Sequence, residues 1–155
     1  MEYKTNVMRI LDKMKIDYLS HSYANTSVVS GIDVANVLKQ DPKQVFKTLV
    51  TVGKSKKYYV FVIPVAEELD LKKAAQSVNE KSIEMLKAKE LLPLTGYVHG
   101  GCSPIGMKKM FTTIIDTSAV AFDTIIFSAG KIGYQVQISL EALKKVIDYS
   151  LENVV

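Results

Sequence analysis

The chain has 155 residues, of which 48% are hydrophobic and 23% charged, and it carries eight glycines and four prolines. This composition is typical of a folded protein and excludes a disordered, collagen-like or coiled-coil chain. No apolar run approaches the ~20 residues that a membrane helix needs. The N-terminus has no apolar signal-peptide core, and a lone cysteine cannot form an internal disulfide. We therefore expect one domain over residues 1–155, located in the cytoplasm and with no membrane partner.

Basic residues outnumber acidic ones. Twenty lysines and arginines stand against sixteen aspartates and glutamates, which gives a formal net charge of +4. A mild basic excess is compatible with a polyanionic partner such as nucleic acid, but it does not identify one by itself.

An amphipathic helix is predicted at the N-terminus, because apolar residues recur there at helical spacing. These residues are Val7, Ile10, Leu11 and Met14. A loosely alternating segment over residues 16–23 predicts a short strand. Ser30 has the side chain of a helix N-cap, which predicts a helix over residues 31–38. The inward face predicted for this second helix consists of Val34, Val37 and Leu38.

A β-hairpin is predicted in the middle of the sequence. Residues 46–52 and 58–63 are rich in β-branched and aromatic side chains, which are typical of strands. The polar segment 53–57 between them has the length of a hairpin connection.

The second half of the sequence predicts short helices and strands in mixed order. Helical segments are expected over residues 70–77 and 87–92, with a strand over residues 82–85 between them. Further strands are expected over residues 96–99, 112–115, 125–128 and 134–138. A final helix follows an N-cap at Ser139, with an inward face of Leu140, Leu143, Val146 and Ile147. Because helices and strands do not alternate regularly, we expect the α+β class with a mixed sheet.

Catalytic motifs are scarce. His21 and His99 are the only histidines and Cys102 is the only thiol, and their spacing is not that of a zinc site. We expect neither a metal nor a cofactor. Cys102 and His99 could form a nucleophile and its base, but they lie three residues apart, whereas such pairs are usually distant in sequence. A packed cysteine is the favoured interpretation.

Lys47 is a candidate functional residue because it lies inside an otherwise apolar strand. A lysine in such a strand must reach the sheet edge, pair with a carboxylate or face a pocket. The alternative is an edge-strand lysine that deters aggregation. The local pattern leaves both interpretations open.

A glycine-containing loop over residues 100–106 is a second candidate. Two consecutive glycines after an extended segment would let backbone N–H groups approach a carbonyl oxygen or an oxyanion. A plain glycine turn is the alternative. The residues of interest in this loop are Gly100, Gly101, Ser103 and Pro104.

A second glycine-containing loop, over residues 128–133, contains Ser128, Gly130 and Lys131. Its serine could donate a hydrogen bond to a ligand and its lysine could contact a phosphate, although an ordinary turn has the same composition. Tyr23 follows the first predicted strand and could stack on a base, while a core tyrosine is the alternative.

Taken together and in order, several segments resemble the YbaK/EbsC family, whose members are free-standing relatives of the editing domain of bacterial prolyl-tRNA synthetase. The likeness covers nearly the whole chain. The segments that carry it are residues 41–42, 45–49, 69–75, 95–98, 100–106, 108–109 and 128–131.

The resemblance implies a mixed, partly barrel-like sheet with peripheral helices, and an enzyme that deacylates Cys-tRNA(Pro), with Cys-tRNA(Cys) as a second candidate substrate. Prolyl-tRNA synthetase mischarges cysteine because one pocket cannot strongly reject a near-isostere. In the family the thiol of the bound cysteinyl group attacks its own ester, so no protein nucleophile is needed. The implied partners are the 3′ aminoacyl end of mischarged tRNA and prolyl-tRNA synthetase.

The resemblance also implies roles for individual residues. Lys47 would contact the terminal adenosine or its phosphate and stabilise developing charge. Backbone amides around Gly101 would hold the carbonyl oxygen, and Tyr23 and Ser128 would shape the pocket. The other matching loop residues, expected to contact substrate, are Gly100, Ser103, Pro104 and Gly130.

Two positions depart from the family pattern. Gln135 stands where several relatives have an acidic residue, and Ser30 stands where some have an aromatic one. Both bear on amino-acid specificity. A non-catalytic tRNA- or nucleotide-binding module and a regulatory protein remain the rival interpretations, and a wholly exposed Lys47 would favour the binding module.

Overall fold

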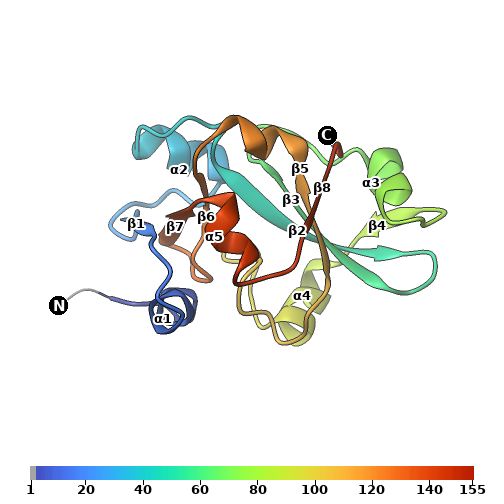
Figure 1. The fold of residues 1–155 in the computed structure, drawn as a ribbon, viewed down its shortest axis with the longest axis horizontal. Coiled ribbons are helices and arrows are strands. Elements are labelled where there is room, and N and C mark those ends of the chain that lie inside the picture. The colour runs from blue at the N-terminus through green and yellow to red at the C-terminus, as the bar shows by residue number, and fades with distance from the viewer. Residues whose placement is uncertain (1–2) are drawn as a thin grey trace.

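The computed structural model describes residues 3–155, which form two β-sheets with helices packed around them (Figure 1). The helices are α1 (Asn6–Lys13), α2 (Gly31–Val37), α3 (Leu71–Ser77), α4 (Ala88–Thr95), α5 (Leu140–Lys144) and the 3-10 helix η1 (Thr117–Ala121). The strands are β1 (Leu19–Ser22), β2 (Phe46–Gly53), β3 (Tyr58–Pro64), β4 (Ile83–Met85), β5 (Thr112–Asp116), β6 (Ile125–Ser128), β7 (Tyr134–Ile138) and β8 (Ser150–Glu152).

The two sheets differ in strand direction. The smaller sheet is antiparallel and has the strand order β1-β7-β6. The larger sheet has the order β4-β2-β3-β5-β8 and is mixed, because β5 and β8 run parallel to their neighbours. The α+β class with a mixed sheet is therefore confirmed.

The predicted hairpin is confirmed in the larger sheet. β2 and β3 form an antiparallel ladder from the pair Phe46 and Pro64 to the pair Val52 and Tyr58. In Figure 1 the hairpin crosses the molecule and its tip projects beside α3. Because β5 also flanks β3 and apolar clusters cover both faces of β3, residues 59–64 are buried.

Successive side chains of the hairpin point to opposite faces and build two apolar clusters. Phe46 and Val60 belong to the main cluster, which also contains residues of the smaller sheet, whereas Phe61 lies in a second cluster under α3. A single parallel bridge between Val45 and Ile126 joins the two sheets. The sheets otherwise separate, so the described residues form no closed barrel.

The predicted helix starts are confirmed. The Ser30 hydroxyl accepts a hydrogen bond from the Asp33 amide, and the Ser139 hydroxyl caps α5. The predicted inward face of α2 is wrong in one position, because Val34 is buried but Val37 is 46% exposed. The buried residues of α2 are instead the neighbours Val34 and Ala35.

Residues 96–99 are not a strand, contrary to the prediction. Gly96 ends α4 with a left-handed φ of +87°, and Gly100 has a φ of +86° in the turn that follows. The Tyr97 hydroxyl donates to the Ile105 carbonyl oxygen across 2.5 Å, which holds the segment as a packed loop. Sequence analysis also missed η1 and the short strand β8. None of the helices within residues 3–155 combines the length and apolar character needed to span a bilayer.

Candidate functional site

A cleft with a volume of about 570 Å³ runs along the first half of β2. Residues from the start of α2, from the β4–α4 segment, from the loop after α4 and from the ends of β6 and β7 also line it. Elements that are far apart in sequence therefore meet around β2. Two other hollows, of about 580 and 530 Å³, contain none of the predicted site residues.

Four of the eight predicted site residues line this cleft. They are Tyr23, Lys47, Gly100 and Ser128. Tyr23 is only 5% exposed, and its hydroxyl forms no hydrogen bond to any other residue in the range 3–155. The fold thus brings the strand lysine, both candidate loops and the tyrosine to one cleft.

Gly101, Ser103 and Pro104 are buried and do not line the cleft. The Gly101 amide already donates to the Val98 carbonyl oxygen across 3.0 Å. A Cβ on Gly101 would lie 3.1 Å from the Ile132 nitrogen, so the glycine lets the two loops pack closely. The Gly101 amide itself is therefore in use, whereas the prediction that backbone amides around Gly101 hold a carbonyl oxygen also covers its neighbours and stays a prediction.

Gly130 does not line the cleft either. It has a φ of +90°, and a Cβ there would lie 2.9 Å from Cε1 of Tyr97. Its amide donates to the Ser128 hydroxyl oxygen across 3.1 Å. Gly130 therefore helps to orient a hydroxyl that does line the cleft.

Lys47 lies opposite Ile63 in the hairpin and is half-buried. Neither of the two ion pairs found among the described residues involves Lys47, and its ammonium group donates to none of them. A half-buried cation at a cleft wall is available to a ligand with a phosphate or carbonyl oxygen. This placement favours the pocket interpretation of Lys47 over the aggregation-deterring one.

Two further polar side chains of the cleft, those of Thr48 and Gln135, were not predicted as site residues. Thr48 lines the cleft, and its Oγ1 is buried without a hydrogen-bond partner among residues 3–155. Gln135 also lines the cleft and accepts a hydrogen bond at Oε1 from Nε2 of Gln40 across 2.8 Å. The sequence marks Gln135 only as a departure from the family, and the signals for Thr48 are that it is a polar residue in an apolar strand and that it lies in segment 45–49, which carries the family resemblance.

The predicted packing role of Cys102 is confirmed by its burial, although its side chain also lines the cleft. Burial raises the pKa of the Cys102 thiol to about 12, so the thiol stays protonated at neutral pH. His99 is exposed and makes no hydrogen bond to Cys102. No group of three His, Cys, Asp or Glu side chains suited to a metal ion occurs within the described range.

Comparisons with known proteins identify the family of the chain. The model of the aminoacyl-tRNA editing domain family matches residues 26–146. The chain is 44% identical over 143 residues to a protein of Enterococcus faecalis (strain ATCC 700802 / V583) that is named as a proposed Cys-tRNA(Pro)/Cys-tRNA(Cys) deacylase, EbsC. That match covers 92% of this chain and 87% of the relative.

Solved structures show the same fold. One, described as a proposed trans-editing enzyme for prolyl-tRNA synthetase, has a TM-score of 0.80 and 19% identity, with 98% of each chain covered. Another, a hypothetical protein, has a TM-score of 0.84 and 16% identity, with 97% of this chain and 99% of that chain covered. The predicted resemblance is confirmed: the chain belongs to the aminoacyl-tRNA editing domain family.

Proposed function

We propose that this chain is a trans-acting deacylase that removes cysteine from Cys-tRNA(Pro), with Cys-tRNA(Cys) as a second substrate. The family and the name of the Enterococcus faecalis relative support this proposal. The observation that carries it is the composition of the cleft. Lys47 has no partner there, whereas the one thiol, Cys102, is held protonated by burial. The cleft thus offers groups that can position a ligand. It offers no activated nucleophile among the described residues.

A substrate-assisted reaction fits such a cleft. The thiol sulfur of the cysteinyl group attacks the ester carbonyl carbon, forms a carbon–sulfur bond and breaks the bond to the ribose oxygen. The thiol proton ends on that oxygen, so the products are a cyclic thiolactone and free tRNA. The protein then contributes orientation and stabilisation of the negative charge on the carbonyl oxygen.

Three residues have proposed roles in this reaction. Lys47 contacts the terminal adenosine or its phosphate and stabilises charge that develops during attack. Tyr23 and Ser128 shape the pocket around the cysteinyl group and the ribose. The support for these roles is that all three line one cleft and that the Tyr23 hydroxyl and the Lys47 ammonium group are unpaired within residues 3–155.

The partner in this proposal is the 3′ aminoacyl end of mischarged tRNA. Prolyl-tRNA synthetase, which generates Cys-tRNA(Pro), is a second proposed partner, and the cytoplasm is the proposed location. Residues 1–155 act as one domain in this proposal, because the cleft draws on segments from Tyr23 to Gln135.

A deacylation panel tests the proposed function. The purified protein is incubated with Cys-, Ala-, Ser- and Pro-tRNA(Pro) and with Cys-tRNA(Cys), and the released amino-acid product is identified. We expect Cys-tRNA(Pro) to be cleaved fastest, with thiolactone as the first product. Binding of charged tRNA without cleavage of any ester would instead support the non-catalytic binding module.

A further inference from the structure

On the side that faces the cleft, part of β2 has no neighbouring strand within residues 3–155 to pair with. β3 accompanies β2 along one side. On the other side, β4 pairs only from Thr51 onward, and β6 contacts the start of the strand through the bridge between Val45 and Ile126. No described strand lies beside residues 47–49 on that side, and all three residues line the cleft. An unpaired strand edge can accept another extended segment.

The backbone of Thr48 points into this gap. The Val50 carbonyl oxygen accepts a hydrogen bond from the Leu86 amide across 3.1 Å, so the polar backbone groups of Val50 face the β4 side. The Lys54 amide likewise donates to Ser82 on that side. In an antiparallel ladder these directions alternate along the strand, so every second residue points the same way. The N–H and C=O groups of Thr48 therefore face the open edge.

The side chain of Thr48 adds a third polar group at the same place. Its Oγ1 is buried and has no hydrogen-bond partner among residues 3–155. Buried polar atoms are nearly always paired in native proteins, and an unpaired one is costly. The neighbouring Lys47 side chain projects from the opposite face of the strand. A ligand at this edge therefore lies between the Thr48 hydroxyl and the Lys47 side chain.

We propose that Thr48 binds the aminoacyl group by pairing with it as though it were one residue of an additional antiparallel strand. The α-ammonium group donates to the Thr48 carbonyl oxygen and to Oγ1, and the Thr48 N–H donates to the ester carbonyl oxygen. The ligand class is an acyl group with an amine on the carbon next to its carbonyl, which has the donor and acceptor spacing of a strand residue. This inference rests on the proposed function, and it describes how the protein recognises the aminoacyl group of the substrate.

The pairing also supplies a backbone donor that the Gly101 amide does not. The Gly101 amide is occupied by the Val98 carbonyl oxygen. The Thr48 N–H is aimed at the open edge, where a carbonyl oxygen would accept it while negative charge builds up on that oxygen. Thr48 thus orients the ester and stabilises its oxyanion, without forming a covalent bond.

Two uncleavable adenosine probes test this pairing. One is 3′-deoxy-3′-(cysteinylamino)adenosine, and the other is its 3-mercaptopropionyl analogue, which lacks only the α-amine. Dissociation constants are measured by calorimetry for the unmodified protein and for Thr48→Val, which removes Oγ1 and keeps a β-branched side chain. Thr48→Ser keeps the hydroxyl, and Thr112→Val is the matched control on an exposed position of β5.

We expect loss of the amine to weaken binding to the unmodified protein about tenfold, because two hydrogen bonds to a charged group are lost. Thr48→Val should weaken binding of the cysteinyl probe about fivefold and leave binding of the 3-mercaptopropionyl probe unchanged. Thr48→Ser and Thr112→Val should behave as the unmodified protein. Equal effects of Thr48→Val on both probes, or no binding of either probe to the unmodified protein, would overturn the proposal.

A separate measurement tests the proposed hydrogen bond from the Thr48 N–H group to the carbonyl oxygen of the ligand. In nitrogen-15 spectra the Thr48 amide proton should move downfield when the cysteinyl probe binds, because it gains an acceptor. The Thr51 amide, which faces the already paired β3, should move much less. An unmoved Thr48 amide would refute the pairing even if the protein deacylates tRNA. A moved Thr48 amide in a protein that cleaves no ester would refute the proposed function and leave the pairing intact.

Discussion

Nε2 of Gln40 donates a hydrogen bond to Oε1 of Gln135 across 2.8 Å and connects the segment after α2 to β7. Gln135 is only 4% exposed, yet its side chain lines the cleft. Oε1 of Gln40 is buried without a partner among residues 3–155. The Gln135 amide therefore forms part of the cleft wall, and it is bonded to the Gln40 side chain in an environment with little access to water.

A carboxyl group at position 135 should make stability depend on pH. In Gln135→Glu, burial should raise the folded-state pKa of the new carboxyl above its unfolded value. Folding then favours the protonated form, so the stability of the variant is retained at low pH and is lost as pH rises through that raised pKa. We expect a free energy of unfolding near that of the parent at pH 4 and about 2 kcal/mol lower at pH 8, measured by urea denaturation.

Gln76→Glu is the matched control, because Gln76 is exposed on α3. Its stability should follow that of the parent at both pH values. A Gln135→Glu variant with the same pH profile as Gln76→Glu would show that position 135 is open to water.

Replacing Lys47 should abolish activity and preserve the fold. Lys47→Ala removes an unpaired, half-buried ammonium group from the cleft wall. If Lys47 stabilises developing charge, the rate of Cys-tRNA(Pro) deacylation should fall at least ~100-fold. The melting temperature should change little, because no ion pair within residues 3–155 is lost.

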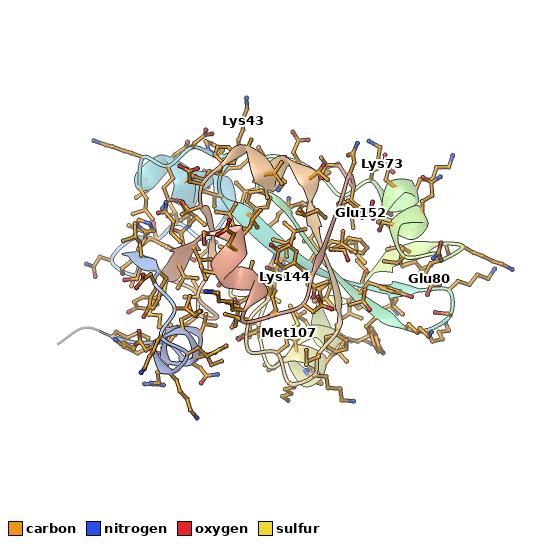
Figure 2. The ribbon with its side chains drawn as sticks, in the orientation of Figure 1. Lys43, Lys73, Glu80, Met107, Lys144 and Glu152 are labelled. Carbon is orange, nitrogen blue, oxygen red and sulfur yellow. The ribbon has the colours of Figure 1, made fainter. Side chains whose placement is uncertain are left out.

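Lys43→Ala is the control for this change in charge. Lys43 is exposed and points away from the body of the protein in Figure 2, and it does not line the cleft. We expect this variant to keep nearly all activity. Full activity in Lys47→Ala would remove Lys47 from the mechanism.

Cys102 should be dispensable for turnover. With a pKa raised to about 12 by burial, its thiol is almost wholly protonated at pH 8 and cannot act as a nucleophile. Cys102→Ser should therefore deacylate Cys-tRNA(Pro) at a near-normal rate. Iodoacetamide should label the folded protein slowly and the urea-unfolded protein quickly. An inactive but folded Cys102→Ser variant would revive the thiol-nucleophile interpretation.

The same burial predicts a loss of stability at alkaline pH. Burial raises the pKa of Tyr97 from 10.0 to about 12, and that of Cys102 from 9.0 to about 12. The unfolded chain therefore releases both protons first, so the free energy of unfolding should fall as pH rises from about 9 toward 12. Each group contributes a slope of at most about 1.4 kcal/mol per pH unit. Cys102→Ser should show a shallower fall, and an unchanged slope would contradict burial of the thiol.

The hairpin and helix caps could be predicted because their signals are local. β-branched runs flank a polar connection at residues 53–57, and Ser30 and Ser139 bond to amides three residues away. The strand predicted at residues 96–99 failed because Val98 and Tyr97 have β-forming side chains, while Gly96 adopts a left-handed conformation that ends α4. The strand propensity of the neighbouring side chains cannot reveal that the backbone at Gly96 is left-handed.

The cleft could be predicted only in part. Lys47 stands out as a charge in an apolar strand, and the glycine loops stand out by composition. Thr48 and Gln40 gain their importance from where β4 and β7 lie relative to β2 and α2, which no local pattern encodes. The three-residue β8 depends likewise on a parallel partner, β5, far away in sequence.

Glu80 ties the tip of the hairpin to the segment after α3, at the end of the molecule labelled in Figure 2. Its carboxylate accepts hydrogen bonds from the Ser55 amide across 3.1 Å, from the Ser55 hydroxyl and from the Tyr59 hydroxyl across 2.5 Å. The hydrogen bond from Ser55, followed by that from Tyr59, lowers the pKa of Glu80. A lowered pKa means that the folded state favours the carboxylate, so this contribution to stability is present at neutral pH and is lost as pH falls through the folded pKa.

Glu80→Gln should therefore lower the melting temperature at pH 7 by a few degrees and have a smaller effect at a low pH, below the folded-state pKa, where the carboxylate of the parent is protonated. Glu84→Gln, at an exposed position of β4, is the control and should leave the melting temperature unchanged at both pH values. Deacylation should be unaffected by either variant, because neither residue lines the cleft. An effect of Glu80→Gln that does not shrink as the pH is lowered from 7 through the folded-state pKa would show that the carboxylate charge does not hold the hairpin tip.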